Sequence, residues 1–355
     1  MIAEDTEIEI IRTPHSRITQ VDFDNIPFGR VFSDHMFEMD YVDGEWINKK
    51  ITPYAPLSMS PASSVLHYGQ ACFEGMKAFK TDEGRVCLFR PMDNAKRINY
   101  SAKRLCMPEI PNEIFMKAVK TLVEIDRDWV PNKRGTSLYI RPFMFATDSY
   151  VGVKASDTYK FIIFTCPVGQ YYNKPLKLKV EREFSRACPG GIGQTKAAGN
   201  YAGSLYPAKM AIEQGFDQLL WTDSSTHEYV EESGTMNVGF LIDGIFYTPP
   251  TTGTILKGIT RNSVLTMLKD WEVPIVEERL KVEFIEEAFK KGSVQEAFGI
   301  GTAATIARVE SISIDGTNYE IPLKENSIAE RLKEEMKDIK RGLVEDKFNW
   351  LTWLR

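Results

Sequence analysis

Short apolar or alternating stretches with turn residues nearby predict strands in both halves of the chain. In the first half the expected strands are HMFEMDYVDGEWI (35–47), RVCLFRP (85–91), TSLYIRPFMFAT (136–147) and YKFIIFTCPV (159–168). In the second half they are KLKVEREFSRA (177–187), DQLLWTD (217–223), HEYVEESGTMNVGFLIDGIFYTPP (227–250) and EAFGIGTAATIARVESISI (296–314). Asp243-Gly244 is a typical two-residue hairpin turn.

Other stretches carry apolar residues three or four positions apart, the spacing that predicts amphipathic helices. These are 93–106, 112–130, 203–216, 258–272, 284–293 and 325–342. Strands and helices are interspersed without the regular rhythm of a doubly wound parallel sheet, so the pattern predicts an α+β fold in two domains. The polar stretch around Pro175 suggests a first domain over 1–170, a connection over 171–176 and a second domain over 177–355.

Composition narrows the class of protein. The chain has 355 residues and a net charge of −5, a balance that disfavours a general nucleic-acid binder. We expect no signal peptide and no membrane span, because no apolar run approaches the roughly 20 residues that a span requires. The five cysteines show no CxxC spacing and the four histidines no HExxH, which favours reduced thiols, a cytoplasmic location and no bound metal.

The glycine-rich stretch CPGGIGQTKAAGNYAGSL (188–205) surrounds one lysine, Lys196, with very small residues. It lacks the GxxxxGK[ST] order of a phosphate loop and the third glycine of a dinucleotide motif. Small neighbours would let a carbonyl cofactor such as pyridoxal phosphate approach the amine closely. Taken alone, the stretch is better explained by a surface loop with a solvated lysine.

A pyridoxal-phosphate site also needs an anion cradle, a carboxylate for the pyridine nitrogen and donors for the substrate carboxylate. Gly258 precedes a predicted helix, whose first amides would bind phosphate. Thr302 lies in a second Gly-Thr turn, and Arg90 precedes a proline. In VEESGTMN, strand alternation puts Glu231 and Glu232 on opposite faces, so that only one of them would point into a site.

Together these motifs resemble one family. HYGQACFEGMKAF, LFRP, SLYIRPF, CPVGQYY, GGIGQTKAAGNYAGSL, EESGTMN, GITRNSV and GIGTA occur in the order found in branched-chain amino-acid aminotransferases, which are fold-type IV pyridoxal-phosphate enzymes. The resemblance covers nearly the whole chain. It implies the two-domain fold of that type, pyridoxal 5′-phosphate as cofactor, and reversible transamination of leucine, isoleucine and valine with 2-oxoglutarate.

The resemblance also implies roles for individual residues. Lys196 would be the Schiff-base lysine and proton shuttle, Tyr201 would bond the phenolic oxygen of the cofactor, and Glu232 would pair with the pyridine nitrogen. The residues implied for the phosphate are Arg90, Ile259, Thr260 and Thr302.

On the substrate side, the resemblance implies that Thr235 and the amide of Ala303 receive the substrate carboxylate. Arg141 would meet the side-chain carboxylate of glutamate. The aromatic residues implied for the pocket are Phe28, Tyr68, Phe73, Tyr139 and Tyr171. The loop SYVGV (149–153) would cover the site of a neighbouring subunit, which implies a homodimer.

Several alternatives stay open at this point. Tyr139 and Tyr171 could be plain core aromatics, Arg141 could form a structural ion pair, and Lys77 is a rival Schiff-base lysine without small neighbours. A D-amino-acid aminotransferase or an aminodeoxychorismate lyase would share the lysine, the glutamate and the phosphate cradle. A non-catalytic pyridoxal-phosphate carrier is the rival from another class.

One departure from the family pattern concerns thiols. Animal members of the family carry a CxxC just after GTA, linked to redox sensitivity, where this chain has Ala304 and Ala307. We therefore expect activity that is insensitive to mild oxidation at this place. Strong loss of activity on peroxide treatment, fully reversed by thiol, would count against it.

Overall fold

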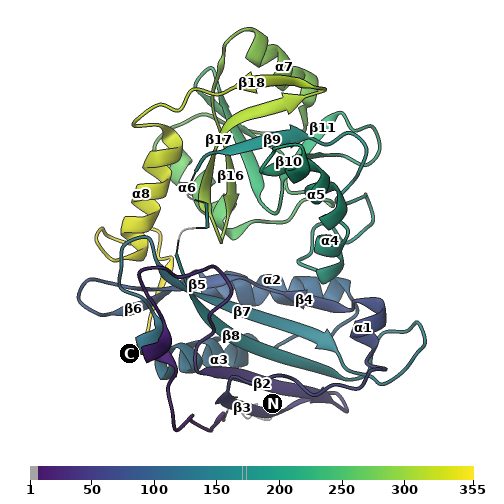
Figure 1. Ribbon diagram of the computed structural model, residues 1–355, viewed down its shortest axis with the longest axis vertical. Coiled ribbons are helices and arrows are strands. Elements are labelled where there is room, and N and C mark those ends of the chain that lie inside the picture. Colours follow the sequence, from purple (N-terminus) through teal and green to yellow (C-terminus); the bar gives the residue numbers. More distant parts are fainter. Residues whose placement is uncertain (1–6, 170, 173) are drawn as a thin grey trace. The chain divides into compact units, whose positions relative to one another are not determined.

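The structure, a computed structural model, describes residues 7–169, 171–172 and 174–355 (Figure 1). Residues 1–6, Gln170 at the end of the expected first domain, and Asn173 in the expected connection lie outside the described residues. The chain divides into two compact units. The first extends to Tyr171 and includes Thr195–Gly199 and Lys337–Arg355, whereas the second comprises Tyr172–Gln194 and Asn200–Met336. The domain limits expected from the sequence stay a prediction.

The first unit is built on a mixed sheet of nine described strands, with the order β1-β3-β2-β8-β7-β5-β6-β19 and with β4 paired to β7. Its strands are β1 (Glu9–Ile10), β2 (His35–Val42), β3 (Glu45–Pro53), β4 (Ala71–Phe73), β5 (Met76–Lys80), β6 (Val86–Phe89), β7 (Ser137–Ala146), β8 (Tyr159–Val168) and β19 (Leu351–Trp353). The C-terminal strand β19 pairs with β6, since Leu351 lies opposite Phe89.

The two faces of this sheet differ because side chains alternate along each strand. On β7, Leu138, Ile140 and Met144 point to one face and pack in a core with apolar residues of two helices. Tyr139 and Arg141 alternate with them and so point to the other face. The helices and turns of the unit are η1 (Ile18–Gln20), α1 (Ser64–Tyr68), α2 (Pro91–Arg104), α3 (Asn112–Ile125) and η2 (Arg127–Trp129).

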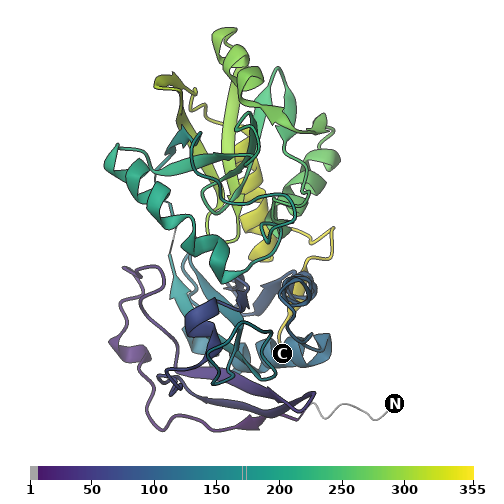
Figure 2. The same ribbon diagram turned by 90° about the vertical axis from the view of Figure 1, so that its right-hand side faces the viewer.

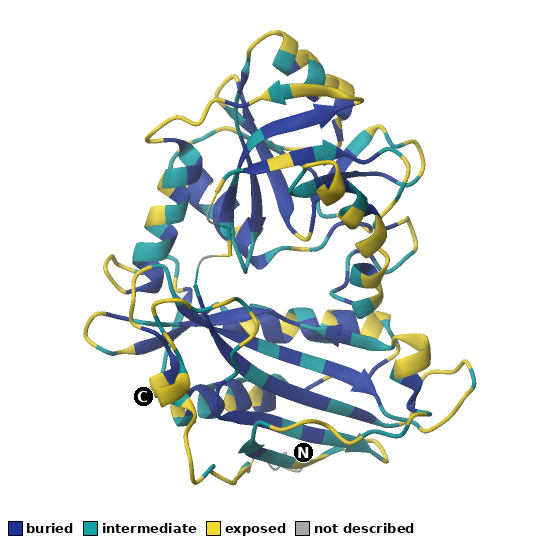
Figure 3. Ribbon diagram, viewed as in Figure 1, coloured by how far each residue is buried: buried dark blue, intermediate teal, exposed yellow. Residues whose placement is uncertain are grey.

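The second unit is built on a mixed sheet of ten described strands, with the order β14-β13-β12-β16-β17-β9-β10-β11-β15 and with β18 paired to β17. Its strands are β9 (Leu176–Val180), β10 (Gln218–Thr222), β11 (Tyr229–Ser233), β12 (Asn237–Ile242), β13 (Ile245–Thr248), β14 (Ile275–Glu277), β15 (Leu280–Lys281), β16 (Val294–Gly301), β17 (Thr305–Ile314) and β18 (Thr317–Glu320). The central strands of both sheets are largely buried (Figure 3).

Five α-helices follow β9 in the described chain; Figure 2 shows them from a second direction. They are α4 (Ala198–Ala202), α5 (Leu205–Glu213), α6 (Ile259–Asp270), α7 (Val282–Lys290) and α8 (Ile328–Lys340). Within the part of the chain that the structure describes, no helix is both long and apolar enough to cross a membrane.

The predicted α+β class is confirmed, and most predicted elements are present. The strand expected over 177–187 is wrong beyond Val180. There the Glu181 carboxylate accepts hydrogen bonds from the N–H groups of Glu183 and Phe184, which bends the chain into a turn. Asp243 and Gly244 both have positive φ, as the predicted two-residue turn requires.

Candidate active site

In the first unit, the backbone around Lys196 is hydrogen-bonded to a strand and a helix. The N–H of Phe73 donates to the Lys196 carbonyl at 3.1 Å, and Cys72 forms a bridge with Ala197. The N–H of Lys196 donates to Ser101 Oγ at 3.0 Å on α2. These contacts fix the Lys196 backbone, while its side chain is half-buried.

The ring of Phe73 contacts two cationic groups. The Lys196 amine lies 4.8 Å from the ring centroid and the Arg141 guanidinium 4.6 Å from it. Both lie within the range of cation–π attraction. The predicted lysine and the predicted substrate arginine are therefore brought together by one predicted pocket residue.

Aromatic side chains continue this site. Phe28 lies 5.5 Å from Tyr139 and 4.7 Å from Tyr171, ring centroid to centroid. Arg141 Nη2 donates to the Tyr139 hydroxyl at 3.0 Å, and a Cβ added to Gly75 would lie only 2.1 Å from that hydroxyl oxygen. Glycine at position 75 thus leaves space for the Tyr139 hydroxyl.

Arg141 contacts these aromatic rings rather than a carboxylate. Its contacts among the described residues are with the Phe73 and Tyr139 side chains, and its buried Nε has no hydrogen-bond partner there. A buried guanidinium nitrogen without an acceptor is costly, and an incoming carboxylate would satisfy it. The structural ion pair considered from the sequence is therefore not found in the described residues.

Two other predicted residues of the first unit have the following surroundings. Tyr68, at the end of α1, is exposed and its ring contacts only His67 among the described rings. Arg90 precedes Pro91 and has φ of 51°, which is unusual for a residue other than glycine. Its Nε lies 2.7 Å from Asp93 Oδ2.

In the second unit, Glu232 is a buried carboxylate with several donors. Its Oε1 accepts from Asn237 Nδ2 and from the N–H of Leu256, each at 3.0 Å. Its Oε2 lies 3.0 Å from Arg186 Nε in an ion pair whose two side chains are both buried. Such contacts hold the carboxylate in one orientation.

The prediction that Glu231 and Glu232 point to opposite faces is wrong. The pairing of β11 with β10 is shifted between Leu220 and Thr222, so the two glutamates oppose a single residue in a β-bulge. Glu231 bonds Thr254 while Glu232 bonds Leu256, so both carboxylates reach the same connecting segment. Burial raises the pKa of Glu231, more than the Thr254 hydroxyl and the Arg186 charge lower it.

Asn237 connects the other predicted residues of this unit. Asn237 is paired with Ile300 of β16 in the sheet. The Ser233–Met236 turn, which contains Thr235, directly precedes Asn237. Thr235 therefore lies near the end of β16, which is followed by Thr302 and Ala303. Glycines permit this packing, since a Cβ at Gly299 would meet Met236 Cε at 2.6 Å.

The first turn of α6 borders the same residue. A Cβ at Gly258, which caps the helix, would meet Asn237 Oδ1 at 2.0 Å. The amides of Ile259 and Thr260 follow at the helix N-terminus, where amides have no intrahelical acceptor and bind anions.

Tyr201 lies on α4, and the side chain of its neighbour Asn200 donates to the Ile192 carbonyl at 2.9 Å.

These donors fit pyridoxal phosphate. A helix N-terminus and a threonine hydroxyl suit its phosphate, and a buried, oriented carboxylate suits a protonated ring nitrogen.

The sequence did not reveal Arg186, which has no local signal, or Asn237, which stood within the quoted ESGTMN motif. Lys77, the rival lysine, is buried on β5, and burial lowers its pKa to about 8.

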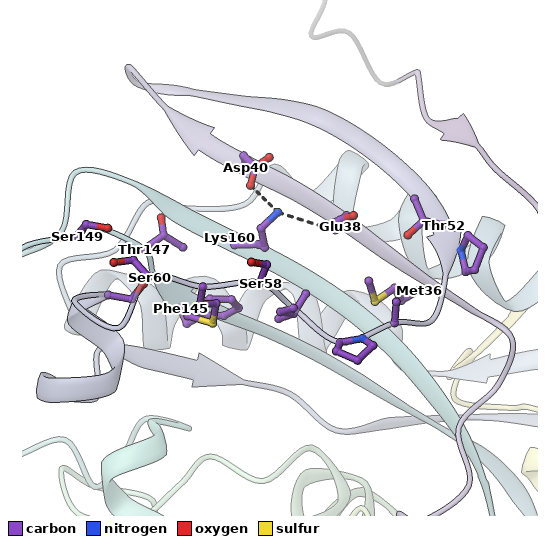
Figure 4. Close-up of a pocket in the computed structure, with 16 residues that line it drawn as sticks. Met36, Glu38, Asp40, Thr52, Ser58, Ser60, Phe145, Thr147, Ser149 and Lys160 are labelled. Atoms are coloured by element: carbon purple, nitrogen blue, oxygen red, sulfur yellow. Dashed lines mark hydrogen bonds and ion pairs between the residues drawn. The ribbon is translucent and has the colours of Figure 1, made fainter.

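A pocket of about 700 Å³ on the first unit does not coincide with the predicted site (Figure 4). It is lined by residues such as Met36, Phe145 and Lys160, whose amine lies 2.7 Å from Asp40 Oδ1. None of the predicted cofactor or substrate residues lines it, and Ser149 is its only residue from the 149–153 loop.

Comparison with known proteins shows the family of the chain. Residues 71–312, more than half of the chain, match the model of the amino-transferase class IV family, so the chain belongs to the class IV aminotransferases. Within that class it belongs to the branched-chain amino-acid aminotransferases. It is 48% identical over 336 residues to branched-chain-amino-acid aminotransferase 2 of Bacillus subtilis (strain 168), and the match covers 93% of each chain.

Solved structures give the same result. The branched-chain aminotransferase of Thermoproteus uzoniensis, solved with norvaline, has a TM-score of 0.74 and 25% identity, over 90% of this chain and 100% of that one. The T.th. branched-chain amino acid aminotransferase, complexed with N-(5′-phosphopyridoxyl)-L-glutamate, has a TM-score of 0.71 and 26% identity, over 88% of this chain and 97% of that one.

Proposed function

We propose that this chain catalyses the reversible transamination of branched-chain L-amino acids with 2-oxoglutarate, using pyridoxal 5′-phosphate. The observation that carries the proposal is the shared contact of Phe73 with the Lys196 amine and the Arg141 guanidinium. In this proposal the amine is the reactive group and the guanidinium receives a carboxylate, both beside one aromatic ring. Such a ring accepts an aliphatic side chain, and the arginine accepts an acidic one.

We assign the attachment of the cofactor and the proton transfers to Lys196. Its amine would attach the cofactor and, once an incoming amino acid has taken its place, would remove the proton from the substrate Cα and return it at the neighbouring carbon of the cofactor. When bound, pyridoxal phosphate supplies an electron sink for the negative charge left on Cα. Phe73 would flank the amine, and the Ser101 hydroxyl would hold the Lys196 backbone.

Residues of the second unit are assigned to hold the cofactor and the substrate. Glu232, oriented by Asn237 and Arg186, would keep the pyridine nitrogen protonated. Tyr201 would bond the phenolic oxygen, while Thr235 and the Ala303 amide would receive the substrate carboxylate. The residues assigned to the phosphate are Arg90, Ile259, Thr260 and Thr302.

We further propose a homodimer in the cytoplasm, in which the 149–153 loop covers the partner's site. The loop exposes Tyr150, Val151 and Val153, which favours a partner that covers these apolar side chains. Hydrogen bonds from the Tyr150 N–H to the Ala62 carbonyl and from the Ser64 N–H to the Asp148 carbonyl join this loop to α1. Tyr68, exposed at the end of α1, would then serve the partner's pocket rather than its own.

The cysteines support the proposed cytoplasmic location. All five are free, as a reducing compartment requires.

A titration of the cofactor absorbance tests the function. L-leucine, L-valine and L-glutamate should each convert the bound cofactor to its amino form, while D-alanine should not. Conversion by D-alanine in preference to L-leucine would assign the chain to D-amino acids. Absorbance that no amino acid changes would indicate a carrier rather than an enzyme.

A further inference from the structure

The C-terminal segment of the chain holds the backbone of Arg90. This arginine follows β6 and precedes Pro91 of α2, and its φ of 51° and ψ of 45° place it in the left-handed region. Its N–H donates to the Trp350 carbonyl at 2.8 Å. A residue other than glycine keeps such a conformation only where its surroundings fix it, and such positions cluster at functional sites. The hydrogen bond to Trp350 is one contact that fixes it.

The side chain of Arg90 contacts the same tryptophan. Its guanidinium carbon lies 5.7 Å from the centroid of the Trp350 ring, within the range of cation–π attraction. The carboxylate of Asp93, three residues along the chain, lies 2.7 Å from Arg90 Nε. The Arg90 side chain is only 13% exposed, so both contacts act on a mostly buried group. A ring and a carboxylate therefore orient the guanidinium together.

Trp350 is itself held in place by its neighbours. It is buried, and its ring centroid lies 5.6 Å from that of Phe89. The Asp346 carboxylate accepts the N–H groups of Trp350 and Leu351 at 2.9 and 2.7 Å. Leu351 pairs with Phe89, the residue before Arg90, in the ladder between β19 and β6. The C-terminal turn and strand thus present Trp350 to Arg90 in a fixed position.

We propose that Trp350 is a positioning residue that holds the Arg90 guanidinium in the orientation that binds the cofactor phosphate. The inference rests on the proposed role of Arg90 in phosphate binding. Recognition of phosphate by arginine depends on the direction of its planar fork as well as on its charge. The contacts with Trp350 and Asp93 restrict that direction before the phosphate binds, which lowers the entropic cost of binding.

The test measures how strongly the apoenzyme prefers pyridoxal phosphate to pyridoxal, which lacks the phosphate. The Kd for pyridoxal divided by the Kd for pyridoxal phosphate isolates the phosphate contribution, and it does not depend on turnover. Trp350→Leu retains the backbone carbonyl but removes the ring, so this ratio should fall about 5-fold. Trp350→Phe retains an aromatic ring and should stay within about twofold of the wild type. An unchanged ratio in Trp350→Leu overturns the proposal.

Trp353→Leu is the matched control from the same C-terminal segment. The Trp353 ring also contacts an arginine, since the guanidinium carbon of Arg85 lies 4.0 Å from its centroid, but Arg85 is not assigned to the cofactor. Trp353→Leu should therefore leave the ratio within about twofold of the wild type. Equal losses in Trp350→Leu and Trp353→Leu would mean that any loosening of the segment weakens phosphate binding, and would overturn the proposal.

Arg90→Met separates this inference from the proposed function. If Arg90 binds the phosphate, this variant should lower the ratio about 10-fold or more. Adding Trp350→Leu to it should lower the ratio less than about twofold further, because both changes act through one guanidinium. Fully additive losses would overturn the inference while the role of Arg90 stands. An unchanged ratio in Arg90→Met would overturn the assignment of Arg90 itself, and the inference with it.

A second measurement decides if Trp350→Leu does not fold. Protein that carries fluorinated tryptophan gives a separate fluorine NMR signal for each tryptophan, and Trp350→Phe and Trp353→Phe identify the two that matter. When pyridoxal phosphate is added to the apoenzyme, the Trp350 signal should shift because the adjacent guanidinium acquires an anion, whereas the Trp353 signal should stay in place. A Trp350 signal that does not move contradicts the proposal.

Discussion

Arg186 Nε lies 3.0 Å from Glu232 Oε2, and the two side chains are only 8% and 4% exposed. Arg186 also donates to the carbonyls of Thr254 and Gly193. Arg186 therefore links the Glu232 carboxylate, which is assigned to the pyridine nitrogen, with the segments that contain Gly193 and Thr254. A buried ion pair of this kind restricts the orientation of the carboxylate, and its loss leaves a buried charge without its partner.

Arg186→Met should lower both stability and activity. Removing one partner of a buried pair costs about 3 kcal/mol or more, and the misoriented Glu232 should lower kcat at least about 10-fold. Thermal unfolding and steady-state kinetics measure the two effects. Arg186→Lys, which retains the charge, should recover part of both losses. Full activity in Arg186→Met would show that Glu232 needs no such orientation.

The neighbouring glutamates should differ in their effects on catalysis. Glu232→Gln removes the charge assigned to the pyridine nitrogen, and kcat should fall about 100-fold. Glu231→Gln should change kcat less than about threefold, because Glu231 bonds only Thr254 at its Oε1 and its Oε2 has no partner among the described residues. The same assay on both variants gives the comparison. Equal losses would mean that the bulge brings both carboxylates into use.

Arg141 should discriminate between the two substrates. Arg141→Met removes the cation assigned to the side-chain carboxylate of glutamate, so the KM for 2-oxoglutarate should rise about 10-fold or more. The half-reaction with L-leucine, which has no such carboxylate, should change less than about threefold. Arg85→Met is a matched control, because Arg85 also stacks on an aromatic ring, that of Trp353. Equal losses for both substrates would assign Arg141 a structural role.

The stability of the protein should rise between pH 7 and pH 9. Burial, and the charge of Lys77, lower the pKa of Lys340 to about 7, whereas an unfolded lysine titrates near 10.5. The unfolded chain therefore binds more protons across this range, so stability increases with pH, by roughly 2 kcal/mol for this group. Urea unfolding at the two pH values measures it.

Lys340→Met is the control for that slope. The amine lies 4.5 Å from the Phe89 ring centroid, in surroundings that a methionine would suit. The variant should gain stability at pH 7 and show a flatter dependence on pH. A slope unchanged from the wild type would assign the effect to other groups.

Local patterns predicted much of the fold. The apolar spacing over 112–130 predicted α3, and the alternation along 136–147 predicted β7, because each pattern reflects one face packed on a core. The strand β19 was not predicted, since its pairing with β6 joins residues more than 250 positions apart. No local signal encodes such a contact.

The candidate site was predicted by resemblance more than by pattern. Lys196 has no distinctive neighbourhood beyond its small residues, and its contact with Phe73 spans 123 positions (196 − 73) of the chain. Strict alternation misplaced Glu231 and Glu232, because a bulge cannot be read from one strand alone. Arg186 was missed for a related reason: a buried arginine is identified by its carboxylate partner, which lies elsewhere in the sequence.

The most direct test of the account is the reaction of Lys196→Ala with L-leucine and 2-oxoglutarate, followed by product formation and by the absorbance of added pyridoxal phosphate. The wild-type protein should form glutamate and show the absorbance of a lysine-bound cofactor. The variant should lose turnover and that absorbance, and Lys77→Met, a matched buried lysine, should keep the absorbance. A variant that lacks Lys196 but still turns over L-leucine with a lysine-bound cofactor would contradict the account.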